Sequence, residues 1–263
     1  MTSRYLHGLS GLVLMALAAA ASAEPVIIEF TTAGAAPRGE TLAQFRRDLR
    51  APRVQTLAAE SGHARPAIRR EYQTVFFGAA VDASPAAIAE LRQLPYVRAI
   101  HPDLPVEAYW SAKVADARER VNAGHLAARG DGMVVAVIDS GIDYTHPALG
   151  GGLGNSFKVI GGWDFVNDDG DPMDDNGHGT HVAGIIAASS SDILGVAPAA
   201  RLVAYKVLNA HGSGHASDII AAIERAVDPN GDGDPADHVD VINLSLGGPG
   251  TADDPASRAV TKA

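Results

Sequence analysis

Residues 134–143 read VVAVIDSGID, and this stretch decides the fold that we predict for the chain. An uninterrupted apolar run of mostly β-branched residues is typical of a strand buried on both faces, as the strands of parallel sheets are. Asp139 then lies at the carboxyl end of the strand, where open α/β sheets place reactive groups. A carboxylate there needs a partner, and an imidazole Nδ1–H is a natural one. We therefore predict an α/β fold with a histidine near Asp139.

Residues 176–184 read NGHGTHVAG and supply that histidine. Asn176 and Gly177 can leave the preceding loop and cap a helix that begins at His178. The small residues of this helix let another backbone pack closely, as a rigidly held general base requires. His178 and His181 are three positions apart, whereas the zinc-binding helix of metalloproteases has histidines at i and i+4. We therefore favour a general base over a metal ligand.

The order of these residues along the chain is also informative. Asp139 followed by His178 is two thirds of a nucleophile-activating set in the order Asp, His, Ser, which is the order in subtilisin. Together the two segments resemble the motifs of the subtilisin-like serine proteases (peptidase S8). The resemblance implies a parallel-sheet catalytic domain that cleaves polypeptide substrates, with Asp139 as the orienting carboxylate and His178 as the general acid and base.

The composition is that of a globular protein, with 46% hydrophobic and 20% charged residues among 263. There is no cysteine, which excludes both a disulfide framework and a thiol nucleophile. The formal net charge of −10 argues against nucleic acid as a partner.

Residues 1–23 predict a secretory signal peptide. They contain Arg4 near the start, an apolar run over residues 12–20, and the ending Ala21-Ser22-Ala23. The apolar run is shorter than the ~20 residues that a membrane-spanning helix needs. We therefore expect cleavage after Ala23, a secreted protein and no membrane association.

Residues 24–110 predict a small α+β domain. Strands are expected over residues 25–30, 72–81 and 97–100, with a helix over 41–59 that Pro52 kinks and a second helix starting at Ser84-Pro85. This alternation resembles the ferredoxin-like inhibitory propeptide (inhibitor I9 type) of secreted subtilases. The resemblance implies an intramolecular inhibitor whose tail, from His101 to about Trp110, occupies the substrate cleft until it is cut. An unrelated α+β binding domain is the alternative.

Residues 111–263 complete the predicted domain organisation as the first part of the peptidase domain. Residues 201–208 predict another parallel strand, and Gly212, Ser213 and Gly214 follow it. The resemblance implies that this glycine-rich segment pairs with an extended substrate peptide as an added strand, and a plain turn is the alternative. Ser217 and Asp218 are then expected to cap a helix.

A third buried strand is expected over residues 239–244, and Ser245, Leu246 and Gly247 follow it. The resemblance implies that these three residues line the pocket for the substrate side chain that precedes the cut bond. Ser245 lacks both the strained strand-to-helix setting and the Gly-Thr-Ser-Met-Ala sequence of the family nucleophile. We therefore assign it a binding role.

Two acidic segments raise the question of bound calcium. Residues 164–175 contain six Asp and residues 228–240 contain five, and clustered carboxylates repel unless they are solvated or bridged. The second segment spaces oxygen ligands as an EF-hand loop does, but Val239 replaces the bidentate Glu. A structural calcium site and a solvated acidic loop remain alternatives. The candidate ligands are Asp228, Asn230, Asp232 and Asp234.

The sequence contains no Gly-Thr-Ser-Met segment. The part after residue 110 is also shorter than the ~250 residues that a large α/β domain can occupy. We therefore expect a C-terminally truncated catalytic domain whose serine lies beyond residue 263, and no peptidase activity from this chain alone. Two other hypotheses are a non-catalytic exported module that inhibits or chaperones a protease, and a calcium-binding structural protein.

Overall fold

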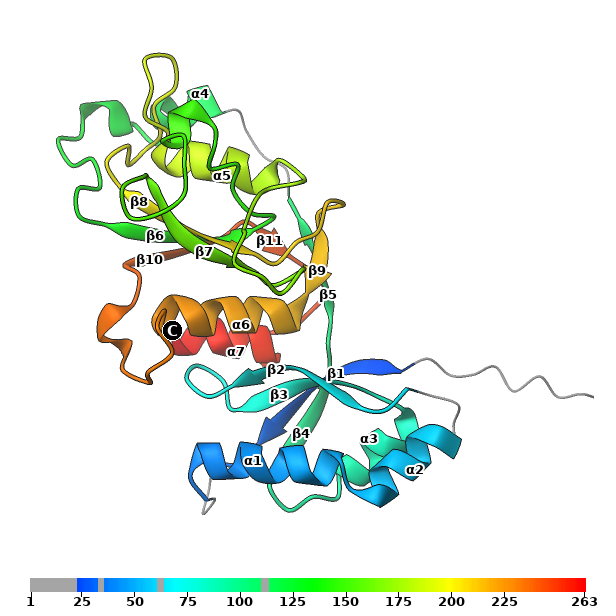
Figure 1. Cartoon of the computed structure of the whole chain (residues 1–263). Helices are drawn as coiled ribbons and strands as arrows, with labels where there is room; N and C mark the ends of the chain where they lie inside the picture. Colours follow the sequence, from blue (N-terminus) through cyan, green and yellow to red (C-terminus); the bar gives the residue numbers. More distant parts are fainter. Residues whose placement is uncertain (1–22, 33–35, 61–63, 110–113) are drawn as a thin grey trace, which may run out of the picture.

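The computed structural model describes residues 23–32, 36–60, 64–109 and 114–263, so nearly all of the predicted signal peptide lies outside the described residues. The chain forms two units joined by an extended segment (Figure 1). The first unit contains β1 (Glu24–Phe30), α1 (Arg38–Leu49), α2 (Pro52–Glu60), β2 (Ala67–Tyr72), β3 (Gly78–Ala83), α3 (Pro85–Leu91) and β4 (Val97–Pro102). The joining segment contains β5 (Pro105–Ala108).

The second unit is built on a parallel sheet. The strands of this sheet are β6 (Val134–Asp139), β7 (Val159–Asp164), β8 (Arg201–Lys206) and β10 (Val241–Leu244). The unit also contains β9 (Ser213–His215) and β11 (Leu246–Gly247), which pair with β5. Its helices are α4 (Val114–Arg120), α5 (His178–Ala187), α6 (Ala216–Val227) and α7 (Pro255–Lys262), with short 3-10 turns η1 (Ala123–His125), η2 (Pro147–Leu149) and η3 (Pro235–Asp237). The predicted α/β class, with a small α+β unit before it, is confirmed.

In the first unit, four antiparallel strands lie in the order β2-β3-β1-β4. Successive side chains of a strand point to opposite faces, and both faces of β1 are covered. Ile28 belongs to the core that also contains Phe45 of α1, whereas its neighbour Ile27 belongs to the core that also contains Ile223 of α6. One face of this sheet therefore serves its own helices and the other face serves the second unit.

The structure corrects two predicted elements of the first unit. Residues 72–81, predicted as one strand, form the end of β2, a connection and the start of β3, because the amides of residues 73–76 point at the carboxylate of Glu224. The helix predicted over residues 41–59 is divided into α1 and α2. Pro52 begins the second helix because the first residue of a helix needs no N–H partner.

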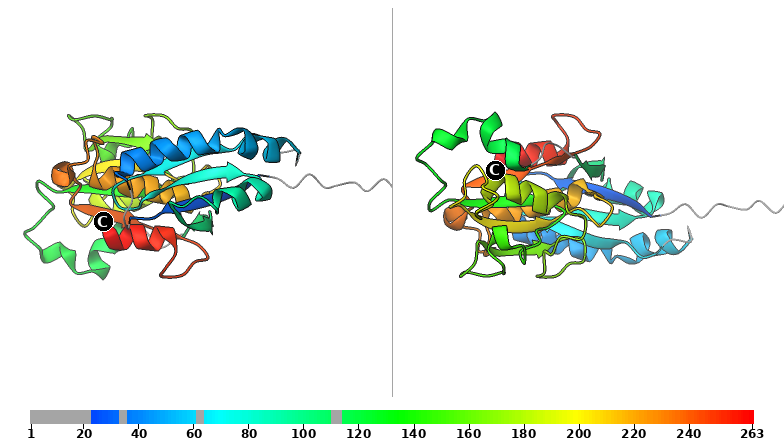
Figure 2. Two further views of the ribbon diagram at one scale, coloured as in Figure 1. Left: turned by 90° about the horizontal axis from the view of Figure 1, so that it is seen from below. Right: turned by 90° about the horizontal axis from the view of Figure 1, so that it is seen from above.

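In the second unit, the order β10-β6-β8-β7 places the predicted strand β6 inside the sheet. Val137 faces the core shared with Val182 of α5, and Ile138 faces the core shared with Ile220 of α6. The sheet thus lies between α5 on one face and α6 and α7 on the other (Figure 1). In Figure 2, α7 (red) lies at the lower edge of the left view and at the upper edge of the right view. Asp139 ends β6, as predicted.

The sheet of the first unit packs against α6 and α7. The hydroxyl of Tyr72 donates to the carbonyl of Ser217 at 2.9 Å, and Nη1 and Nη2 of Arg258 donate to the carboxylate of Glu29 at 2.9 and 2.7 Å. The expected cap by Ser217 and Asp218 is wrong, because α6 begins earlier, at Ala216. Asp218 forms an ion pair with Arg70 of β2 instead, at 3.1 Å.

Candidate active site

The predicted contact between Asp139 and His178 is present. Nδ1 of His178 lies 2.7 Å from Oδ1 of Asp139, although the residues are 39 positions apart, and both side chains are almost completely buried. Helix α5 begins at His178 after Gly177, whose φ of 98° is in the left-handed region that glycine tolerates. The end of a parallel strand and the start of a helix therefore place the carboxylate and the imidazole together.

The second ring nitrogen of His178 also faces an acceptor. Nε2 lies 2.8 Å from the backbone carbonyl oxygen of Tyr109, which directly follows β5. A carbonyl only accepts hydrogen bonds, and so does an ionised carboxylate, so the doubly protonated imidazolium satisfies both contacts. The geometry therefore favours a positively charged His178 while Tyr109 is in place.

The pKa values of the pair agree with this picture. Burial lowers the pKa of His178, but its hydrogen bonds with Asp139 and with the Tyr109 carbonyl outweigh burial and raise the pKa above its ordinary value. Burial raises the pKa of Asp139, against the lowering effect of its hydrogen bonds with His178 and with the Ser140 amide. Among the described residues, Oδ2 of Asp139 is buried without a hydrogen-bond partner.

These shifts predict a pH-dependent contribution of His178 to stability. A histidine whose pKa is raised on folding stabilises the protein fully below its unfolded pKa of about 6.5 and loses this contribution as the pH rises through the folded value. Urea unfolding of the wild type and of His178→Gln, compared from about pH 6 to pH 9, should show a difference that shrinks as the pH rises. A difference that stays constant or grows over this range would contradict the protonated state of His178.

The predicted substrate-binding residues flank the segment that contacts His178. β5 is the middle strand of a three-stranded antiparallel sheet, between β9 and β11. The Ala108 amide donates to the Gly212 carbonyl at 2.9 Å, and the Tyr109 amide donates to the Ser245 carbonyl at 3.4 Å. The structure thus brings both predicted segments, residues 212–214 and 245–247, to the two edges of one extended peptide. Tyr109 of this peptide contacts His178.

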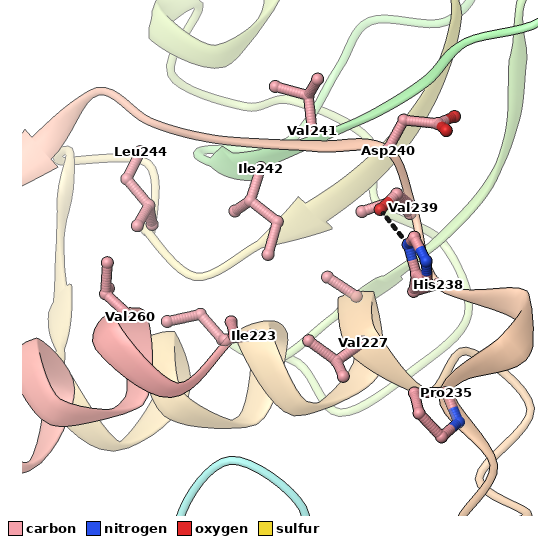
Figure 3. A pocket seen from close by; sticks show the side chains of 12 residues that line it. Ile223, Val227, Pro235, His238, Val239, Asp240, Val241, Ile242, Leu244 and Val260 are labelled. Carbon is pink, nitrogen blue, oxygen red and sulfur yellow. Dashed lines mark hydrogen bonds between the residues drawn. The ribbon is translucent and has the colours of Figure 1, made fainter.

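A separate cavity of about 450 Å³ lies between β10, α6 and α7 (Figure 3). Its walls are mainly aliphatic, and its titratable residues are His238 and Asp240. Nδ1 of His238 is hydrogen-bonded to the carbonyl of Val239 at 2.8 Å. None of the predicted site residues lines this cavity. The candidate active site is therefore the Asp139–His178 pair, with the backbone of Tyr109 against the imidazole.

The predicted calcium ligands do not form a cation cage. Both carboxylate oxygens of Asp228 accept hydrogen bonds from the amides of residues 231–233. Asn230, Asp232 and Asp234 each accept from the amide two positions further along, so the alternating pattern builds successive Asx turns. Across the described part of the chain, no group of three or more His, Cys, Asp or Glu is arranged to hold a metal ion. The candidate ligands are thus held in Asx turns within their own loop, and calcium binding by them stays a prediction.

Sequence reasoning missed two residues that surround the pair. Asp174, predicted only as part of an acidic loop, accepts hydrogen bonds from the hydroxyl of Ser140 and from several groups at the start of α5. Lys206, at the end of β8, is 1% exposed and donates to the carbonyls of Ser140 and Leu208. A lysine that ends an apolar strand is the signal that could have found the second residue.

A buried Asp–His pair at the carboxyl end of a parallel strand is typical of hydrolases that activate a nucleophile through histidine. The comparison with known sequences identifies the family. Residues 130–263 match the Subtilase family, and residues 26–109 match the Peptidase inhibitor I9 family. The chain therefore belongs to the subtilase family and carries an I9 domain before its peptidase domain.

Several characterised proteins are similar to this chain. The thermophilic serine proteinase of Bacillus sp. (strain AK1) is 35% identical over 81% of the chain and 53% of that relative. The minor extracellular protease Vpr of Bacillus subtilis (strain 168) is 37% identical over 68% of the chain and 24% of Vpr. Subtilisin E of the same organism is 41% identical over 65% of the chain and 42% of subtilisin E. The chain thus spans about half or less of the length of these relatives.

In the ranges that the structure describes, no helix is both long enough and apolar enough to cross a bilayer.

Proposed function

We propose that the chain is part of the precursor of a secreted serine endopeptidase, with residues 1–23 as the export signal. The observation that carries the proposal is the line of contacts from Asp139 through His178 to the carbonyl of Tyr109, at 2.7 and 2.8 Å. It places a peptide carbonyl at the imidazole nitrogen that would serve as the general base. The extended peptide is held on both edges by β9 and β11, which is how a protease presents a substrate backbone.

The proposed reaction is acyl transfer. Nε2 of a neutral His178 takes the proton of a serine hydroxyl, whose oxygen forms a bond to the peptide carbonyl carbon. His178 then gives the proton to the departing amine as the C–N bond breaks, leaving an acyl-enzyme that water hydrolyses by the same proton transfers. Asp139 keeps the Nδ1 proton in place and stabilises the imidazolium. We propose that the serine lies beyond residue 263, because the sequence lacks the family nucleophile motif.

We propose that the I9 domain is the intramolecular inhibitor of this site. Strand β5 fills the positions of a substrate strand, and the Tyr109 carbonyl occupies the hydrogen-bonding position of Nε2. As long as it does so, His178 is held protonated and cannot act as a base. The register of β5 points to the bond after Tyr109 as the one that is cut when the precursor matures.

The function can be tested with the protein made from the complete reading frame. We expect it to hydrolyse casein, to release a fragment ending at Tyr109, and to lose both reactions in His178→Ala by about 10⁴-fold or more. Residues 24–263 alone should show no turnover. Turnover by residues 24–263 that His178→Ala abolishes would contradict the placement of the serine. Unchanged hydrolysis in the His178→Ala form of the complete protein would refute the proposed mechanism.

A further inference from the structure

The first turn of α5 is attached to the loop after β6 by one carboxylate. Oδ1 of Asp174 accepts from the hydroxyl of Ser140 at 2.8 Å and from the amides of Asn176 and Gly177 at 3.0 and 2.9 Å. Oδ2 accepts from both the amide and the hydroxyl of Thr180. Five donors from three segments therefore converge on a single side chain.

These contacts surround the Asp139–His178 pair on both sides. Ser140 directly follows Asp139, and its amide donates to the Asp139 carboxylate at 2.7 Å. The Ser140 hydroxyl, which donates to Asp174, also accepts from the amide of Gly179, which directly follows His178, at 2.9 Å. Thr180 continues the connection, since its hydroxyl accepts from the Asp143 amide at 2.8 Å. The backbones that carry the two active-site residues are thus held together through Asp174.

We infer that Asp174 is a positioning residue, whose carboxylate clamps the first turn of α5 to the loop after β6 and so holds the His178 imidazole against Asp139. The inference deepens the proposed function and rests on it. None of these five donors belongs to the imidazole or to the β5 peptide beside it, although the charge of Asp174 also raises the pKa of His178. Asp174 acts through the two backbones, and an ionised carboxylate is the group that can accept from all five donors.

The charge state of Asp174 is consistent with this role. Burial on its own raises the pKa of Asp174, but hydrogen bonds from Thr180, Gly177 and Asn176 outweigh it and hold the pKa below its ordinary value. The carboxylate is therefore ionised over the range in which His178 titrates.

The test uses residues 24–263 with ¹⁵N-labelled histidine, so that it does not depend on turnover. A proton on Nδ1 of His178 that is bonded to Asp139 should give a low-field NMR signal that Asp139→Asn removes. We expect Asp174→Asn to remove or broaden this signal and to move the His178 titration to lower pH. Ser140→Ala, which keeps the charge of Asp174 and deletes one hydroxyl, should broaden the same signal and so separates positioning from charge.

Asp171→Asn is the matched control. Asp171 lies in the same acidic loop and loses the same charge, but its carboxylate accepts from the Tyr144 hydroxyl and not from α5. This variant should leave the signal and the titration unchanged. The positioning role is refuted if the Asp139-dependent signal is unaffected in Ser140→Ala and changes no more in Asp174→Asn than in Asp171→Asn. The proposed function stands in that case. If the wild type shows no signal that depends on Asp139, the proposed function itself fails. Ser140→Ala also keeps the test open if Asp174→Asn does not fold.

Discussion

Gly179→Ala is expected to destabilise the protein by about 3 kcal/mol, the upper end of the cost of overpacking a tight site. A Cβ at position 179 would lie 2.1 Å from the carbonyl oxygen of Gly141 and 3.2 Å from Cβ of Asp139. The obstacle is backbone, which cannot rotate away, so the loop after β6 and the start of α5 would have to move apart. Alanine favours helix over glycine by about 1 kcal/mol, which is too little to offset the clash.

The measurement is thermal and urea unfolding of residues 24–263. For a chain of this size, 3 kcal/mol corresponds to a fall in Tm of roughly 6–12 °C. Gly170→Ala is the control, because a Cβ at Gly170 would meet nothing within 4 Å. Equal stability of the two variants would show that α5 and the loop can separate without cost, which would also weaken the geometry of the Asp139–His178 pair.

Glu224→Ala is expected to loosen the I9 domain from the peptidase domain and to lower the free energy of unfolding by about 3 kcal/mol. The carboxylate of Glu224, on α6, accepts hydrogen bonds from four successive amides of the β2–β3 connection, residues 73–76. Each buried donor left without a partner costs about 1–3 kcal/mol, and hydrogen bonds to charged groups are the stronger kind. Val75 and Phe76 are buried, so water cannot readily replace the carboxylate at their amides.

Amide hydrogen exchange of residues 75 and 76 is the most direct readout, together with urea unfolding. Both amides should exchange much faster in Glu224→Ala than in the wild type. Glu90→Ala is the matched control, because the ion pair that Glu90 forms within the described residues is with a mostly exposed Arg53, and such surface pairs contribute about 0–1 kcal/mol. Unchanged protection of the two amides in Glu224→Ala would mean that this contact does not hold the domains together.

The sequence was sufficient to predict the elements that follow from local patterns. The apolar run ending at Asp139 predicted a buried parallel strand, and β6 is that strand. Ser84 followed by Pro85 predicted the start of α3, and the Ser84 hydroxyl indeed accepts from the Ala87 amide. These predictions succeeded because periodicity and capping depend on neighbours in the chain.

The errors arose where distant residues decide the structure. β2 ends at Tyr72 because Glu224, far along the chain, takes the amides that would otherwise continue the strand. Asp218 looked like a helix cap and is instead the ion-pair partner of Arg70 in the other unit. For Asp228, calcium binding stays a prediction, since one-dimensional spacing does not distinguish a cation cage from the Asx turns that this residue forms here. The site residues were easier to identify, since Asp139 and His178 each lie within a distinctive motif.

The two-sided burial of β1 has a consequence for biosynthesis. The sheet that receives α6 and α7 on its outer face lies entirely in the first hundred or so residues, and so leaves the ribosome before either helix does. When Ile223 and its apolar neighbours emerge, the sheet carrying Ile27, against which they pack in the folded protein, has already been synthesised. Nascent chains of this protein therefore need not expose the apolar side of these helices to other polypeptides while the rest of the domain is being translated.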